Sequence, residues 1–179
     1  MRAIESIIYS TVQQKVLQFL LKNPGERFFS SQVTQLAGLT RSATNLALHD
    51  LIETGIIECE TKGRMKFYSV SLDSPLAREM KYVLNLIFLN VTVNKLKPLC
   101  SRIVLFGSAS RGENRKGSDF DLLLITNDKN KVNDILSRSE IREELQPVIV
   151  SQNEYAAMKS GNEVFYKEIQ TGRVLWERK

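Results

Sequence analysis

One stretch determines the fold expected for the second half of this chain of 179 residues. It is Arg102–Thr126, RIVLFGSASRGENRKGSDFDLLLIT. It opens with a short apolar run, Arg102–Phe106, which ends at Gly107, and it closes with a second apolar run, Leu122–Ile125. Short runs rich in β-branched and apolar residues, bounded by glycine and charged residues, are typical of buried strands. The stretch therefore predicts two strands joined by a Gly-Ser turn and a charged loop.

Two carboxylates stand at the entrance of the second predicted strand, at Asp119 and Asp121. Residues i and i+2 of a strand point to the same face, so both side chains should project together, with Cα atoms about 6.6 Å apart. Two acids placed side by side repel each other and require a cation. Because neither Cys nor His is nearby, the fitting ion is Mg²⁺ rather than Zn²⁺.

The Gly-Ser turn supplies the groups that a phosphate needs. Gly107 lets the backbone approach a ligand closely, and Ser108 can cap a following helical turn whose free N–H groups face an anion. Arg111 adds positive charge, as do Arg115 and Lys116. Acids for a metal and a basic turn for phosphates together favour transfer of a phosphorus group from a nucleoside triphosphate.

This combination resembles the nucleotidyltransferases of the polymerase beta superfamily, especially their minimal branch. Their pattern of strand, Gly-Ser, Arg-Gly-Glu and Ser-Asp-x-Asp-Leu stands here as Gly107-Ser108, Arg111-Gly112-Glu113 and Ser118-Asp119-Phe120-Asp121-Leu122. The resemblance implies that Asp119 and Asp121 are catalytic and hold Mg²⁺ as cofactor. It also implies a nucleoside triphosphate bound by Gly107, Ser108 and Arg111.

Such enzymes usually carry a third carboxylate on a later strand, where it helps to activate the attacking hydroxyl. The candidate strand here is Leu145–Val150, and the acidic position falls on Gln146. Gln can orient a hydroxyl but cannot take its proton at neutral pH. Either Glu144, two residues earlier, reaches the same face, or the site binds metal and nucleotide with little or no turnover.

The first part of the chain has the pattern of three helices and a hairpin. The predicted helices cover residues 9–22, 30–37 and 40–54, and two β-prone runs at 56–61 and 66–70 flank a turn that contains Gly63. This order, and the segment LIETGII at 51–57, resemble the winged helix-turn-helix domains of bacterial and archaeal repressors. The resemblance covers roughly residues 9–72.

In a winged helix the third helix enters the major groove of double-stranded DNA with its N-terminal residues. The resemblance therefore implies DNA contacts from the start of this helix and from the tip of the wing: Arg41, Ser42, Thr44, Asn45, Lys62, Arg64 and Lys66. Four nearby acids, Asp50, Glu53, Glu58 and Glu60, dilute the positive field. A protein-docking module is the alternative for this domain.

We therefore expect an α+β protein with a winged helix-turn-helix domain over residues 1–74 and a small nucleotidyltransferase domain, with a mixed sheet and flanking helices, over residues 98–179. A connecting helix is expected at 75–97, and its apolar stripe could join the two domains or pair with the same helix of a second copy. A homodimer is expected because winged-helix repressors usually bind two-fold symmetric operators as dimers. A surface helix is expected over residues 131–144.

The composition adds limits rather than a function. The net charge is +5, but residues 1–74 hold eight basic and seven acidic side chains, so the excess is not concentrated in the predicted DNA-binding part. The longest nearly apolar run, Val83–Val93, is too short and too polar to span a membrane. Two cysteines in unrelated contexts favour a reduced, cytoplasmic protein.

The leading hypothesis is a DNA-binding protein that transfers a nucleoside monophosphate, with Mg²⁺, from a triphosphate to an acceptor that the sequence does not identify. Two alternatives stay open. One is a catalytically degenerate transcription regulator that only senses nucleotide. The other is an interaction protein, such as the antitoxin partner of a toxin, a part that minimal nucleotidyltransferases often play. Gln146 favours the alternatives, and the intact pair Asp119 and Asp121 favours the enzyme.

Overall fold

A computed structural model describes residue 4 and residues 7–178, and it divides the chain into two compact units between Ile87 and Phe88. The division falls within the long helix α5 (Pro75–Leu96). Each unit has its own hydrophobic core, and each is described separately below. No helix in the described part of the chain is both long enough and apolar enough to cross a membrane.

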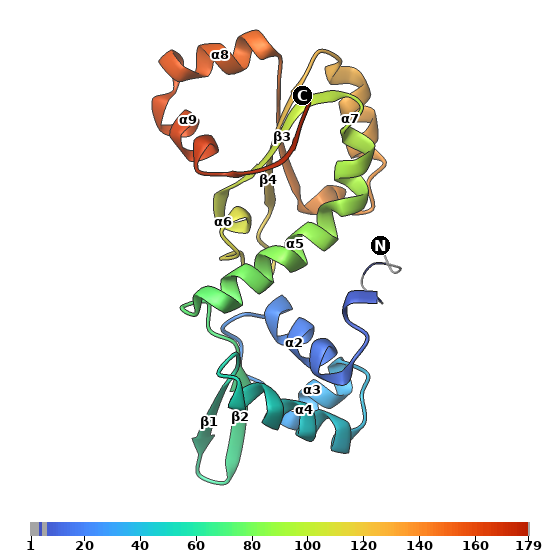
Figure 1. Cartoon of the computed structure of the whole chain (residues 1–179), viewed down its shortest axis with the longest axis vertical. Coiled ribbons are helices and arrows are strands. Elements are labelled where there is room, and N and C mark those ends of the chain that lie inside the picture. Colours follow the sequence, from blue (N-terminus) through green and yellow to red (C-terminus); the bar gives the residue numbers. More distant parts are fainter. Residues whose placement is uncertain (1–3, 5–6, 179) are drawn as a thin grey trace. The chain divides into compact units, whose positions relative to one another are not determined.

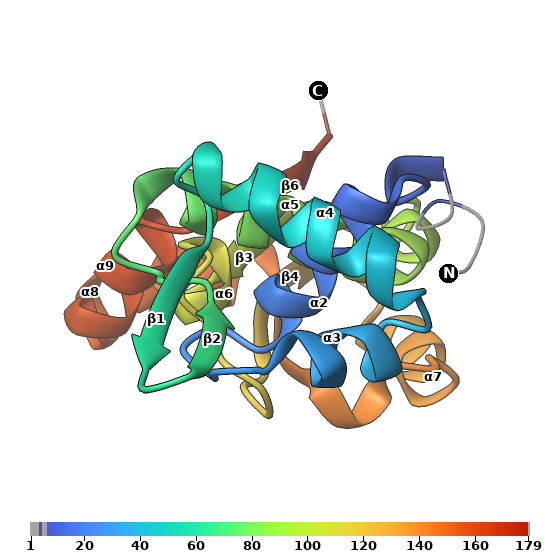
Figure 2. The same ribbon diagram turned by 90° about the horizontal axis from the view of Figure 1, so that it is seen from below.

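The first unit contains a group of helices, a hairpin and the part of α5 up to Ile87 (Figures 1 and 2). The helices are α2 (Val12–Lys22), α3 (Ser30–Leu36) and α4 (Arg41–Glu53), and the hairpin strands are β1 (Glu58–Lys62) and β2 (Met65–Ser69). The strands pair in antiparallel fashion from Glu58 opposite Ser69 to Lys62 opposite Met65. Ahead of α3, Phe28 forms an isolated antiparallel bridge with Tyr68, which ties the segment between α2 and α3 to the hairpin.

Local sequence explains where these helices begin. Thr11 caps α2, because its hydroxyl accepts a hydrogen bond from the Gln14 N–H (3.2 Å) while the Gln14 side chain accepts one from the Thr11 N–H (3.0 Å). Apolar residues three or four positions apart then face the core, with Leu20 of α2 and Ala47 of α4 fully buried. The fold of this unit therefore follows from the same periodicity that predicts it.

The second unit is built on a four-stranded sheet in the order β5-β4-β3-β6. Its strands are β3 (Cys100–Phe106), β4 (Phe120–Thr126), β5 (Leu145–Val150) and β6 (Arg173–Glu177). The central pair β3 and β4 is antiparallel, β3 and β6 are antiparallel, and β4 and β5 are parallel. The predicted mixed sheet is thereby confirmed.

Helices cover both faces of this sheet (Figure 1). One face, which includes Val104 and Leu123, packs against α8 (Gln152–Gly161) and α9 (Glu163–Gln170). The other face carries α7 (Lys129–Ser137) and the part of α5 from Phe88 onward, where the Phe88 ring stacks on Phe120 with centroids 5.1 Å apart. Strands buried on both faces read as continuous apolar runs, as the sequence of β3 and β4 does.

The prediction of a single helix over residues 131–144 is wrong. Helix α7 ends at Ser137, and only a short 3₁₀ turn, η1 (Arg142–Glu144), precedes β5. The intervening Ser139 hydroxyl lies 2.9 Å from the Thr92 hydroxyl of α5 and also accepts a hydrogen bond from the Ile141 N–H (3.4 Å). A serine that bonds its own neighbouring backbone competes with helix formation, and here a tertiary contact holds it in that arrangement.

Candidate functional site

The turn after β3 and the acidic pair at the start of β4 meet at one point. Phe106 at the end of β3 pairs with Asp121 of β4, and Gly107 follows directly as the first residue of the short helix α6 (Gly107–Ser110). Gly107 has φ +67°, and a Cβ added there would lie 2.2 Å from Oδ2 of Asp121. The backbone at Gly107 therefore lies directly against the Asp121 carboxylate, and any side chain at this position would have to displace that carboxylate.

The two predicted carboxylates differ in their environment. Asp119 is exposed and lies one residue ahead of β4, whereas Asp121 is half-buried as the second residue of that strand. The pKa of Asp121 is raised above its ordinary value, first by burial and then by the negative charges of Glu168 and Asp119. A half-buried carboxylate beside two other carboxylates concentrates negative charge, and such a site favours a bound cation.

Ser108 directly follows the glycine that lies against this carboxylate, and its hydroxyl is free of protein partners in the described part of the chain. Its carbonyl accepts hydrogen bonds from the N–H groups of Arg111 (3.2 Å) and Glu113 (2.9 Å), which close the loop after α6. The next serine, Ser110, is buried and donates to the carbonyl of Gly107 (2.7 Å). Within the described residues, no hydrogen bond engages the Ser108 hydroxyl, so it can donate to a ligand.

Arg111 is less available than the sequence indicates. Its Nε lies 2.8 Å from Oε2 of Glu113, and both side chains are largely exposed. An exposed pair of this kind is weak, so a triphosphate could compete for the guanidinium. Gly107, Ser108, Asp119 and Asp121 thus gather at one end of the sheet, with Arg111 on the adjoining loop and paired to a neighbour.

Gln146 occupies the strand position where the sequence analysis places it. In the parallel pair of β4 and β5, Gln146 is the direct partner of Asp121. Partners in register point to the same face of a sheet, so an amide, not a carboxylate, stands beside Asp121. Glu144 lies in η1, where the chain is not extended, so the two-residue alternation that would align it with Gln146 does not apply.

Glu168 of α9 is the acidic residue that sequence reasoning missed. After burial, its negative charge is the main cause of the raised pKa of Asp121, followed by the charge of Asp119. The position has a structural basis: the Phe165 ring packs edge-on against Phe106, with centroids 5.6 Å apart, and Phe106 is the strand partner of Asp121. Glu168 follows Phe165 by three residues, so it lies on the same side of α9. A helix prediction alone gave no sign of which strand this face would meet.

The carboxylates suit a metal that is shared with a substrate better than one held by the protein alone. Among residues 4 and 7–178, no group of three or more His, Cys, Asp or Glu side chains is arranged to hold a metal ion. Asp119 and Asp121 can provide two oxygen ligands. Mg²⁺ is commonly bound by one or two carboxylates together with substrate phosphates, so these residues fit that ion.

The predicted DNA contacts in the first unit are partly exposed and partly engaged. On α4, Arg41 and Ser42 are exposed, and the Asn45 amide oxygen accepts a hydrogen bond from the Ser30 hydroxyl of α3. Thr44 is fully buried, and its hydroxyl donates to the Thr40 carbonyl (2.9 Å). Because Thr44 lies three and four residues before Ala47 and Leu48, it shares their core-facing side, so its prediction as a DNA contact is wrong.

At the tip of the hairpin the three basic residues are not equivalent. Lys62 lies 3.3 Å from Glu60, which also pairs with Arg27 at 2.6 Å. Arg64 and Lys66 are exposed, and neither forms an ion pair with another described residue. Arg64 and Lys66 therefore present their charge to solvent, whereas the charge of Lys62 is partly compensated.

Comparison with known proteins adds similarities of limited extent. No curated protein matches the chain significantly. Among solved structures, AF1382 from Archaeoglobus fulgidus is 16% identical, with a TM-score of 0.39 over 47% of this chain and 94% of the other. A protein from Sulfolobus solfataricus, provisionally described as a nucleotidyltransferase, is 16% identical, with a TM-score of 0.36 over 56% and 87%.

A third structure is Sso10a-2, described as a DNA-binding protein from Sulfolobus solfataricus. It is 21% identical, with a TM-score of 0.32 over 46% of this chain and 92% of the other. The family comparison is more specific, because it locates its match on the chain. Residues 91–170, which include β3, the Gly107 turn and the acidic pair at the start of β4, match the nucleotidyltransferase domain family.

Proposed function

We propose that the second unit transfers a nucleoside monophosphate from a nucleoside triphosphate to a hydroxyl acceptor and releases pyrophosphate. The acceptor oxygen bonds to the α-phosphorus, and the bond from that phosphorus to the oxygen bridging to the β-phosphate breaks. The observation that carries this proposal is the contact between the backbone at Gly107 and the Asp121 carboxylate. It brings a phosphate-binding turn and an acidic pair together within a segment that matches the nucleotidyltransferase domain family. Phosphoryl chemistry requires little more than such positioning and charge stabilisation.

In this proposal, Asp119 and Asp121 hold Mg²⁺. The bound ion supplies charge neutralisation on the phosphate oxygens and helps to align the attacking and leaving groups. The protein groups act around it: the Ser108 hydroxyl and the backbone N–H groups at the start of α6 orient the triphosphate, and Arg111 exchanges its exposed partner Glu113 for a phosphate oxygen. The raised pKa of Asp121 supports a site that is completed by a cation.

Glu168 takes the part of the third carboxylate in this proposal. A carboxylate near Asp121 can accept the proton of the acceptor hydroxyl, which Gln146 cannot do. Gln146 remains able to orient that hydroxyl through hydrogen bonds. The support for Glu168 is its electrostatic influence on Asp121 and the packing of Phe165 on Phe106.

We further propose that the first unit is a winged helix that binds duplex DNA. Its order of helix, bridge, helix, helix and hairpin supports this, with Phe28 as the short strand that pairs with the wing. The contacts would come from Arg41 and Ser42 on α4 and from Arg64 and Lys66 on the wing. Asn45 and Lys62 contribute only if they leave their present partners, Ser30 and Glu60.

A second candidate function is a DNA-binding regulator that senses nucleotide without transferring it. The observation in its favour is the register of Gln146 with Asp121, which puts an amide where the related enzymes carry an acid. Such a protein would bind Mg²⁺ and nucleotide normally and would fail only in the chemical step.

One experiment tests the enzyme proposal. The full chain is incubated with Mg²⁺ and each of the four triphosphates labelled at the α-phosphate, together with RNA and small-molecule extracts, and transferred label is followed. We expect transfer by the wild type that is lost in the double variant Asp119→Asn/Asp121→Asn and kept in Asp134→Asn, a matched change on α7. Nucleotide binding without transfer by the wild type would support the sensor, and equal nucleotide binding by all three proteins would refute the site.

A further inference from the structure

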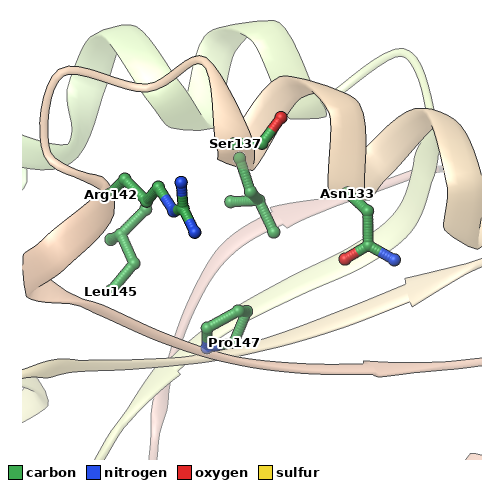
Figure 3. Close-up of a pocket in the computed structure, with 6 residues that line it drawn as sticks. Asn133, Ser137, Arg142, Leu145 and Pro147 are labelled. Atoms are coloured by element: carbon green, nitrogen blue, oxygen red, sulfur yellow. The ribbon is translucent and has the colours of Figure 1, made fainter.

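The second unit contains a cavity that lies away from the acidic pair. Its volume is about 300 Å³, and its lining comes from α7, η1 and β5: Asn133, Leu136, Ser137, Arg142, Leu145 and Pro147 (Figure 3). Because side chains alternate along a strand, Leu145 and Pro147 point to the face of the sheet opposite to that of Gln146. Gln146 shares its face with Asp121, so the cavity is separate from the candidate active site.

The floor of the cavity is apolar. Leu136 and Leu145 are buried, and Pro147 on the edge strand β5 presents its ring (Figure 3). The cavity exists because α7 stops at Ser137 and the chain returns as η1, a break that separates the helix from the start of β5. A hollow with an apolar floor and a few polar groups at its sides is the usual form of a small-molecule site, and this volume lies at the lower end of the usual range.

Two polar side chains converge on this hollow. Figure 3 shows the Arg142 guanidinium and the Asn133 amide on opposite sides of it, both turned toward the space above Pro147. Within the described part of the chain, no hydrogen bond or ion pair engages either side chain, although Glu143 and Glu144 directly follow Arg142. The Ser137 hydroxyl is not available as a donor, because it donates to the carbonyl of Asp134 (2.9 Å).

The chemistry of these groups defines a ligand class. The guanidinium is a planar fork of donors that fits a carboxylate or a phosphate group, and charge-assisted hydrogen bonds of this type are about twice as strong as neutral ones. The amide of Asn133 can both donate and accept. We propose that this cavity binds a small organic anion, with its carboxylate or phosphate group on Arg142 and its apolar body on Leu136, Leu145 and Pro147.

The test uses the full chain and two probes with the same apolar body, benzoate and phenyl phosphate. Binding is followed by the amide signals of residues 133–145 in nuclear magnetic resonance titrations. We expect saturable binding of at least one probe, and a loss of affinity of roughly tenfold or more in Arg142→Gln, since hydrogen bonds to a charged group are lost. Arg142 is exposed, so this variant should fold normally.

Two controls make the result specific. Arg138→Gln removes the same charge from an exposed position nearby that does not line the cavity, and it should bind the probes as the wild type does. Asp121→Asn should also leave these titrations unchanged, which separates the cavity from the nucleotide site. Which of the two probes binds more tightly identifies the carboxylate or the phosphate as the preferred anion.

Three results would overturn the proposal. The first is the absence of saturable binding of either probe at concentrations on the order of 10 mM. The second is equal binding of the neutral analogue benzyl alcohol, which would reduce the site to its apolar floor. The third is equal loss of affinity in Arg138→Gln and Arg142→Gln, which would leave only the general charge of this surface.

Discussion

Asp121 of β4 and Gln146 of β5 are direct neighbours in the parallel strand pair, so an amide stands beside the half-buried carboxylate of the candidate active site. On the other side of Asp121 the backbone at Gly107 makes contact with the carboxylate, and Glu168 of α9 adds a further negative charge. In the two functions proposed above, these neighbours would decide between transfer and nucleotide binding alone.

Replacing Glu168 should distinguish these two functions. If Glu168 accepts the proton of the acceptor, Glu168→Gln should lower the single-turnover rate by about 10²–10⁴-fold and leave Mg²⁺-dependent nucleotide binding intact. Glu163→Gln, on the same helix and paired with Lys167 at 2.7 Å on the surface, is the matched control and should have little effect.

The exchange Gln146→Asp tests the other neighbour. The variant places a carboxylate in register with Asp121. The resemblance to minimal nucleotidyltransferases implies an acidic residue at this position. If the wild type is a sensor, this variant should gain transfer activity in the same single-turnover measurement. Fast transfer by the wild type that neither Glu168→Gln nor Gln146→Asp alters would show that no third carboxylate is needed.

Gly107→Ala should weaken nucleotide binding in addition to the stability that any alanine loses at a positive φ. Gly117 provides the control, because it has φ +80° and an added Cβ would meet nothing within 4 Å. Alanine in the left-handed region costs about 1–2 kcal/mol, so Gly107→Ala and Gly117→Ala should lose a comparable amount of stability to denaturant. Only Gly107→Ala also displaces the Asp121 carboxylate, so it alone should lose Mg²⁺-dependent binding of ATP. Equal ATP binding by the two variants would contradict the contact.

Lys81 should give the first unit a measurable pH dependence. It lies between Ala77 and Leu84 on the side of α5 that joins the core of this unit, and its pKa is lowered to about 8, first by burial and then by the charge of Lys22. A lysine that binds fewer protons when folded makes the protein more stable as the pH rises from about 8 toward the unfolded value of 10.5.

The measurement is a comparison of unfolding free energies between pH 7 and pH 10. Lys81→Met should remove this pH dependence and be more stable than the wild type at pH 7, by up to about 3 kcal/mol. The exposed Lys95→Met is the control. Burial raises the pKa of the Cys100 thiol to about 11, and this group lowers the stability of the protein as the pH rises above 9. The test therefore compares the unfolding free energies of the two variants at each pH and does not use the slope of the wild type alone. Parallel curves for Lys81→Met and Lys95→Met would contradict this account.

DNA binding should depend unequally on the basic residues of the wing. Arg64→Ala and Lys66→Ala should each weaken binding to duplex DNA and reduce the dependence of log K on log salt by about one phosphate contact. Lys62→Ala should have a smaller effect, because Glu60 lies 3.3 Å from this lysine. Lys159→Ala, on α8 of the other unit, is the control, and an equal effect of all four changes would indicate a contribution of net charge alone.

Much of the architecture was predictable from local sequence. The apolar runs on either side of the Gly107 turn indicate β3 and β4 before any pairing is known. The mixed sheet was also predicted and is confirmed. These features depend on the periodicity of apolar residues and on the residues that form turns, and both can be recognised within a short segment of sequence.

The tertiary structure decided the features that depend on which distant elements meet. Packing of α9 on β3 brings Glu168 toward Asp121, and the Thr92–Ser139 contact holds the break after α7 that opens the Arg142 cavity. Packing of α4 in the core likewise buries Thr44, which the sequence alone had suggested as a surface residue. Burial and charge pairing arise between residues remote in the chain, so a helix or strand period shows which residues share a face but not what that face contacts.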